Sequence, residues 1–134
     1  MNTSGNSMTR ILEIAKNQAL LSQGVGRNKN YRVGAVLFDQ KGRIHAKGFN
    51  TYKTHPILAG FTLYPHIHAE SSCLLHRGLD NCSGLSLLAV RVKQPNNQIT
   101  MAKPCEVCYN MLSRSGVKKI YYTDWIGNIN QMET

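Results

Sequence analysis

The sequence lacks any long apolar run and contains few cysteines. No stretch approaches the roughly 18 consecutive apolar residues of a membrane-crossing helix, so no membrane attachment is expected. Four cysteines are too few for a disulfide-dense secreted scaffold. The polar segment Met1–Ser7 has no apolar core of the kind found in signal peptides, and we expect residues 1–7 to be disordered. These absences predict a cytoplasmic protein.

Internal repeats, low-complexity tracts and linkers rich in proline or serine are also absent, which predicts one domain over residues 1–134. A chain of this length buries about two-thirds of its unfolded surface, so it needs neither disulfides nor a metal to form a core. Acidic residues are scarce: 16 Lys and Arg face 7 Asp and Glu, a net charge of +9. This excess favours polyanions or phosphorylated ligands over cationic partners.

Hydrophobic periodicity and turn residues predict alternating helices and strands. The segment 85–92 is almost continuously apolar, which is typical of a central strand covered on both faces. A further short strand within residues 124–134 would bring the sheet to about five strands. The order predicts a three-layer α/β fold, with a central mixed sheet and helices on both faces. The predicted elements are helices over residues 8–22, 66–79 and 104–116, and strands over residues 31–38, 43–49, 85–92 and 117–123.

Two short motifs contain the residues suited to chemistry: His68-Ala69-Glu70 and Pro104-Cys105-Glu106-Val107-Cys108. A Cys-x-x-Cys pair alone could be a redox pair, half of a zinc site or a chance occurrence. Together the motifs offer one histidine and two cysteines, which leave the fourth position of a tetrahedral zinc ion open for water. Glu70 is then a carboxylate beside the metal that is not a ligand, and it can transfer protons.

The order H-x-E followed by P-C-x-x-C resembles the cytidine/deoxycytidylate deaminase superfamily over roughly residues 8–123, and most closely its small phage and bacterial deoxycytidylate members. The resemblance implies a cytidine-deaminase-like fold and one zinc ion held by His68, Cys105 and Cys108. It also implies a zinc-activated water that attacks C4 of cytosine, with Glu70 as the proton shuttle. The expected reaction converts dCMP to dUMP and ammonia, and a homo-oligomer is expected.

The same resemblance suggests residues that contact the substrate. Ala69 matches the residue that borders the base pocket, and Asn50 matches the asparagine that holds the sugar. The region 50–66 has no periodicity and carries Lys53, Thr54 and His55, which either bind a 5′-phosphate or belong to a solvated loop. Tyr121 is a further candidate, although it alternates with Tyr122 on a strand, so at most one of the two lines the pocket.

Three alternatives stay open at this point. A deaminase of single-stranded DNA or RNA would use the basic residues to follow a backbone. A deaminase of tRNA adenosine is less expected, because only eleven residues follow Thr123. A non-enzymatic, zinc-stabilised binding module would have no need of Glu70. A second, structural zinc could be held by His66, Cys73, His76 and Cys82, although an ordinary half-buried thiol is the favoured interpretation of both cysteines.

Overall fold

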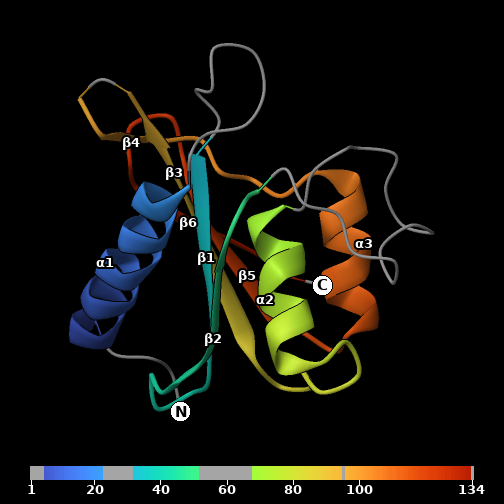
Figure 1. Cartoon of the computed structure of the whole chain (residues 1–134). Coiled ribbons are helices and arrows are strands. Elements are labelled where there is room, and N and C mark those ends of the chain that lie inside the picture. The colour runs from blue at the N-terminus through green and yellow to red at the C-terminus, as the bar shows by residue number, and fades with distance from the viewer. Residues whose placement is uncertain (1–4, 23–31, 52–67, 95, 134) are drawn as a thin grey trace.

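The computed structural model describes residues 5–22, 32–51, 68–94 and 96–133 (Figure 1). This part of the chain contains three helices and six strands, with two strands after each helix. They are α1 (Gly5–Leu21), β1 (Arg32–Phe38), β2 (Ile44–Phe49), α2 (Ala69–Arg77), β3 (Ser86–Lys93), β4 (Gln98–Thr100), α3 (Glu106–Arg114), β5 (Lys119–Thr123) and β6 (Ile129–Glu133).

Every element predicted from the sequence is present, with its ends shifted by a few residues. Helix α1 begins at Gly5, so residues 5–7 are helical and were not expected to be. The short strand expected within residues 124–134 is β6, whereas β4 was not predicted. Among the described residues, no helix has the length and apolar character needed to cross a membrane.

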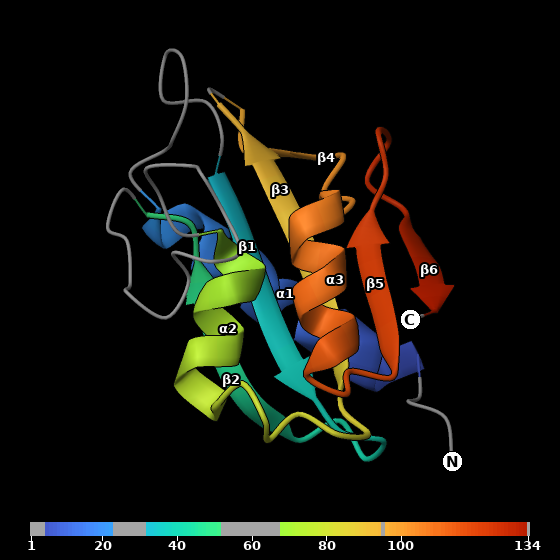
Figure 2. The ribbon, with the colours of Figure 1, turned by 90° about the vertical axis from the view of Figure 1, so that its right-hand side faces the viewer.

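The strands form one mixed sheet in the order β2-β1-β3-β5-β6, with β4 paired to β3. Strand β1 is antiparallel to both β2 and β3, and β3 is parallel to β5, so β2, β3 and β5 run in the same direction. Helix α1 covers one face of the sheet, and α2 and α3 cover the other (Figures 1 and 2). The three-layer α/β fold predicted from the sequence is therefore confirmed.

The topology determines where α2 and α3 begin. Helix α2 lies between β2 and β3 in the chain, and α3 lies between the β3–β4 hairpin and β5, so each helix belongs to a connection between two strands that run in the same direction. A connection of this kind leaves the sheet at the carboxyl end of the first strand and returns to its other end. Both helices therefore begin at the same edge of the sheet, where β2 and β3 end (Figure 2).

Strand β3 is the centre of two separate cores, as its continuous apolar sequence predicts. Its residues Leu87 and Ala89 pack with α2 and α3, whereas Leu88, Val90 and Val92 pack with α1. Successive side chains of a strand point to opposite faces, so a strand buried on both faces needs apolar residues at every position. Odd-numbered β3 residues therefore lie on the α2 and α3 face of the sheet, and even-numbered ones lie on the α1 face.

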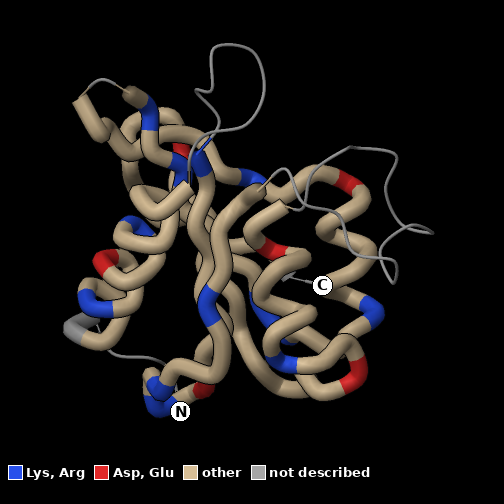
Figure 3. Tube along the Cα trace, in the orientation of Figure 1, with Lys and Arg blue, Asp and Glu red and all other residues tan. Residues whose placement is uncertain are grey.

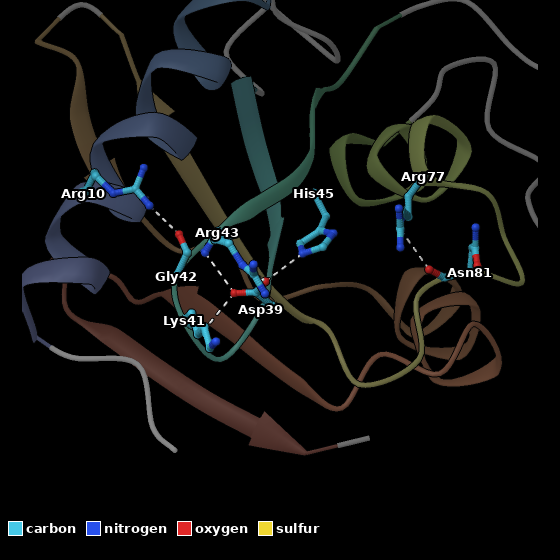
Figure 4. A network of polar contacts seen from close by, with 8 residues as sticks. All are labelled: Arg10, Asp39, Lys41, Gly42, Arg43, His45, Arg77 and Asn81. Carbon is cyan, nitrogen blue, oxygen red and sulfur yellow. Dashed lines mark hydrogen bonds and ion pairs between the residues drawn. The ribbon is translucent and has the colours of Figure 1, made fainter.

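A hydrogen-bonded turn closes the β1–β2 hairpin (Figure 4). Oδ1 of Asp39 accepts from the backbone N–H groups of Lys41 and Arg43 at 2.9 and 3.0 Å, and its Oδ2 contacts Nε of Arg43 and Nε2 of His45. The hydrogen bond with His45 and those with Arg43 and Lys41 hold the pKa of Asp39 well below its usual range. Arg10 of α1 donates to the carbonyl of Gly42, which joins the helix to this turn.

Helix α1 packs so closely on β1 that the strand has no room for a side chain at the point of contact, which is Gly34. A Cβ atom on Gly34 would stand 2.1 Å from the carbonyl oxygen of Ala15 and 2.4 Å from the backbone nitrogen of Ala19. We expect Gly34→Ala to lower the free energy of unfolding by at least about 2 kcal/mol, because rigid backbone atoms must move apart. Chemical denaturation measures this change.

Gly84→Ala is the matched control, since a Cβ atom there meets nothing within 4 Å and only the backbone at φ +77° is strained. That strain costs about 1 kcal/mol. Equal losses in the two variants would contradict the close approach of α1 to β1.

Candidate metal centre

The residues of the two sequence motifs meet where α2 and α3 begin. His68 is the N-cap residue of α2 and Cys105 is the N-cap residue of α3, both with extended backbone (φ −75°, ψ 155° and φ −69°, ψ 169°). Neither side chain caps its own helix. Helix N-termini carry partial positive charge and stabilise thiolates and bound anions, so this is a favourable position for a cysteine ligand.

Three ligand atoms converge at this point. Nδ1 of His68 lies 3.1 Å from Sγ of Cys108 and 3.7 Å from Sγ of Cys105, and all three atoms lie within 4.8 Å of one another. Zinc bonds of about 2.3 Å to sulfur and 2.0 to 2.1 Å to nitrogen place tetrahedral ligand atoms about 3.5 to 4 Å apart. The donor set and its spacing therefore fit one zinc ion, with three protein ligands and one coordination position left open.

The two thiols shift each other's pKa in opposite directions. The hydrogen bond from Cys108 lowers the pKa of Cys105 to about 3, and the charge of His68 acts in the same direction. Donating that hydrogen bond raises the pKa of Cys108 well above its usual range, and burial adds to the effect. The contact with Cys105 raises the pKa of His68. A metal that binds here needs both cysteines as thiolates and the histidine neutral, so its affinity increases with pH.

Glu70 and Ala69 lie in the first turn of α2, directly after the histidine. Ala69 is fully buried, and Glu70 is only 5% exposed. Burial raises the pKa of the Glu70 carboxyl, and the nearby charge of His68 opposes the shift. A carboxyl that is buried beside a metal site without being one of its ligands is placed to exchange protons there.

Ser71 is a contact of the metal centre that the sequence did not indicate. Its hydroxyl is buried 4.0 Å from Sγ of Cys108 and 3.7 Å from Sδ of Met111. The contact lowers the pKa of Cys108, against the effect of burial. Its place three residues after His68 puts both side chains on one face of α2 and could have suggested the contact.

Asn50 terminates the pairing of β2 with β1 and is buried. Its Oδ1 accepts from the backbone N–H of Val33 at 3.0 Å, and its carbonyl accepts from the hydroxyl of Ser22 at 2.9 Å. These bonds fix the side-chain amide at the edge of the sheet where α2 begins.

The two tyrosines of β5 lie on opposite faces of the sheet. Tyr121 packs in the core beneath α1, where its ring centroid is 5.9 Å from that of Phe38. Tyr122 packs in the core beneath α2 and α3, with Val107 and Tyr109. The strand alternation therefore places Tyr121 on the face away from the metal centre, and Tyr122 replaces it as the candidate.

The remaining sequence candidates form no second centre in the described part of the chain. There, His68, Cys105 and Cys108 are the one group of His, Cys, Asp or Glu side chains that could hold a metal. Cys73 donates to the carbonyl of Ala35, Cys82 to that of Gly78, and Nδ1 of His76 contacts that of Lys47. His66, Lys53, Thr54 and His55 lie outside the described residues.

Comparisons with known proteins agree with this geometry. Residues 6–124 match the family model described as the cytidine and deoxycytidylate deaminase zinc-binding region. A solved structure of dCMP deaminase from the cyanophage S-TIM5, in apo form, is 21% identical, with a TM-score of 0.63 over 90% of this chain and 85% of that one. The same enzyme in complex with dCMP and dUMP is 23% identical, with a TM-score of 0.63 over 90% and 83%. No curated protein sequence gives a significant match.

Metal analysis of the purified protein tests the ligand set. We expect one zinc ion per chain and a loss of most of that zinc in Cys108→Ser, because a neutral hydroxyl is a far poorer zinc ligand than a thiolate. The matched control is Cys82→Ser, which alters a buried thiol that donates to the carbonyl of Gly78 away from the metal centre and should leave the zinc content unchanged. Two zinc ions per chain, or full zinc retention in Cys108→Ser, would contradict the assignment.

Proposed function

The chain belongs to the cytidine and deoxycytidylate deaminase zinc-binding family, and from this premise we propose that it hydrolyses the C4 amino group of a cytosine nucleotide, with dCMP as substrate and dUMP and ammonia as products. The observation that carries the proposal is the meeting of His68, Cys105 and Cys108 beside the buried, non-ligating Glu70. A purely structural zinc site has four protein ligands and no use for such a carboxylate.

Each residue of the site then has a separate role in the reaction. When bound, zinc would supply a Lewis acid with one open position for water. Glu70 takes the two protons of the attacking water in turn, and delivers the first to N3 of the base and the second to the departing amino group. Ala69 borders the base, and the amide of Asn50 donates to the sugar. Ser71 orients the Cys108 thiolate through its hydroxyl.

A nucleotide is favoured over a nucleoside or a nucleic acid. The net charge of +9 suits an anionic substrate, and the similar solved structure is of an enzyme crystallised with dCMP and dUMP. Lys53, Thr54 and His55 stay candidates for the phosphate. Lysines and arginines are scattered over all three layers of the described part (Figure 3), which gives less support to a surface that follows a polynucleotide. A cytoplasmic homo-oligomer remains part of the proposal.

A side-by-side assay of ammonia release tests the substrate. The substrates are cytidine, deoxycytidine, dCMP, dCTP and a cytosine-containing single strand, and we expect the highest kcat/KM for dCMP. Activity on the single strand alone would replace the nucleotide with a nucleic acid as the substrate. Absence of ammonia from every cytosine compound, with zinc present in the protein, would overturn deamination itself.

Replacement of the proton shuttle tests the role of Glu70. We expect Glu70→Gln to lower kcat for dCMP by about 10²- to 10⁴-fold, since the amide cannot accept and return a proton. The zinc content should not change, because Glu70 is not a ligand. Glu106→Gln is the matched control: it alters an exposed acid in the first turn of α3 and should leave kcat within about twofold of wild type. A Glu70→Gln protein with wild-type kcat would exclude this mechanism.

A further inference from the structure

Ser71 is a polar residue at an interface that consists mainly of apolar side chains. Helices α2 and α3 lie side by side on one face of the sheet (Figure 2), and the core that they share includes Leu74, Met111 and Leu112. Ser71 is only 6% exposed, so its hydroxyl is largely removed from water. Burial of a hydroxyl is unfavourable unless hydrogen bonds compensate it. The partners of this hydroxyl therefore indicate why a serine occupies the position.

Two sulfur atoms of α3 lie next to the Ser71 hydroxyl. Its oxygen is 3.7 Å from Sδ of Met111 and 4.0 Å from Sγ of Cys108. Both sulfur-bearing residues are themselves buried. They are three residues apart, so they lie on the same face of α3. A hydroxyl has one hydrogen, and it therefore donates to one of these two sulfur atoms at a time.

The two sulfur atoms differ as acceptors once the site holds its metal. The thioether of Met111 is a weak acceptor. Cys108 binds a metal as a thiolate, and a hydrogen bond to an ionised acceptor is about twice as strong as one between neutral groups. The hydroxyl of Ser71 therefore donates to Cys108 in the metal-loaded protein, and the cost of burying it is then compensated.

A hydrogen bond from Ser71 to Cys108 also connects the two halves of the metal centre. Ser71 lies three residues after His68, in the same helix start, whereas Cys105 and Cys108 belong to α3. The bond therefore fixes the position of a cysteine ligand relative to the helix that carries the histidine ligand. Partners of metal ligands that act in this way typically change metal affinity by about 10- to 100-fold when they are removed.

We propose that Ser71 is a positioning residue, which holds the Cys108 ligand by a hydrogen bond across the α2–α3 interface and so retains the metal. The proposal deepens the proposed function, on which it rests, because it names the residue outside the ligand set that keeps the site loaded. Met111 is the alternative acceptor for the same hydroxyl and is not needed for metal retention.

Competition of the zinc-loaded protein with a chromogenic chelator tests this proposal. We expect Ser71→Ala to bind zinc about 10- to 100-fold more weakly than wild type, because Cys108 loses its hydrogen bond. Ser71→Thr keeps the hydroxyl and should recover most of the lost affinity. Ser115→Ala is the matched control: it removes another buried hydroxyl, which donates to the carbonyl of Met111 at 2.8 Å, and should leave zinc affinity unchanged.

The absorption spectrum of the cobalt-substituted protein separates the hydrogen bond from packing at the interface. A thiolate that loses a hydrogen bond holds its electrons less tightly, so its charge-transfer absorption to Co²⁺ moves to lower energy. We expect this shift in Ser71→Ala. Met111→Leu alters the packing of the same interface at similar volume but keeps the hydroxyl, and should give neither the shift nor a loss of zinc affinity.

Neither measurement requires turnover, so the outcome is independent of the proposed function. Weaker zinc binding and a shifted cobalt spectrum in Ser71→Ala support the proposal even if wild type releases no ammonia from dCMP. Wild-type affinity in Ser71→Ala would overturn it and leave deamination intact, and an equal loss in Ser115→Ala or Met111→Leu would also overturn it. Thermal melting shows which variants are folded, and Ser71→Gly replaces Ser71→Ala if the latter is not.

Discussion

The structure depends on one constraint: two helices must begin side by side at the same edge of a sheet. Strands β2, β3 and β5 run in one direction, so α2 and α3, which connect them in turn, both start where β2 and β3 end. The residues at these two starts are His68 and Cys105, and Cys108 follows one turn later on α3. The ligands come from positions 37 and 40 residues apart in the chain, and the topology alone brings them together.

The same arrangement gives the site the features that the proposed chemistry requires. Helix N-termini favour thiolate and bound anions, and the first turn of α2 buries Glu70 two residues after His68. Gly48 allows this turn to lie against β2, since its Cβ position would be 2.8 Å from the side chain of Ser72. Fold and chemistry therefore share one requirement, which is the close packing of the α2 N-terminus on the sheet.

Much of this arrangement could be predicted from the sequence. The apolar run of β3 indicated a strand buried on both faces, and the two motifs predicted the three side chains that meet at the starts of α2 and α3. Strand β4 was missed because it has three residues and pairs only with β3, too little for a pattern to show. The faces of Tyr121 and Tyr122 depend on strand register, which alternation alone does not fix.

The most direct test of the account is X-ray absorption spectroscopy of the zinc-loaded protein at the zinc edge. Because the central claim is a three-ligand site with an open position, it predicts two sulfur atoms at about 2.3 Å and two nitrogen or oxygen atoms at about 2.0 to 2.1 Å. One of the light atoms belongs to His68 and the other to a solvent molecule. A spectrum with three or four sulfur ligands, or with no histidine contribution, would contradict the claim.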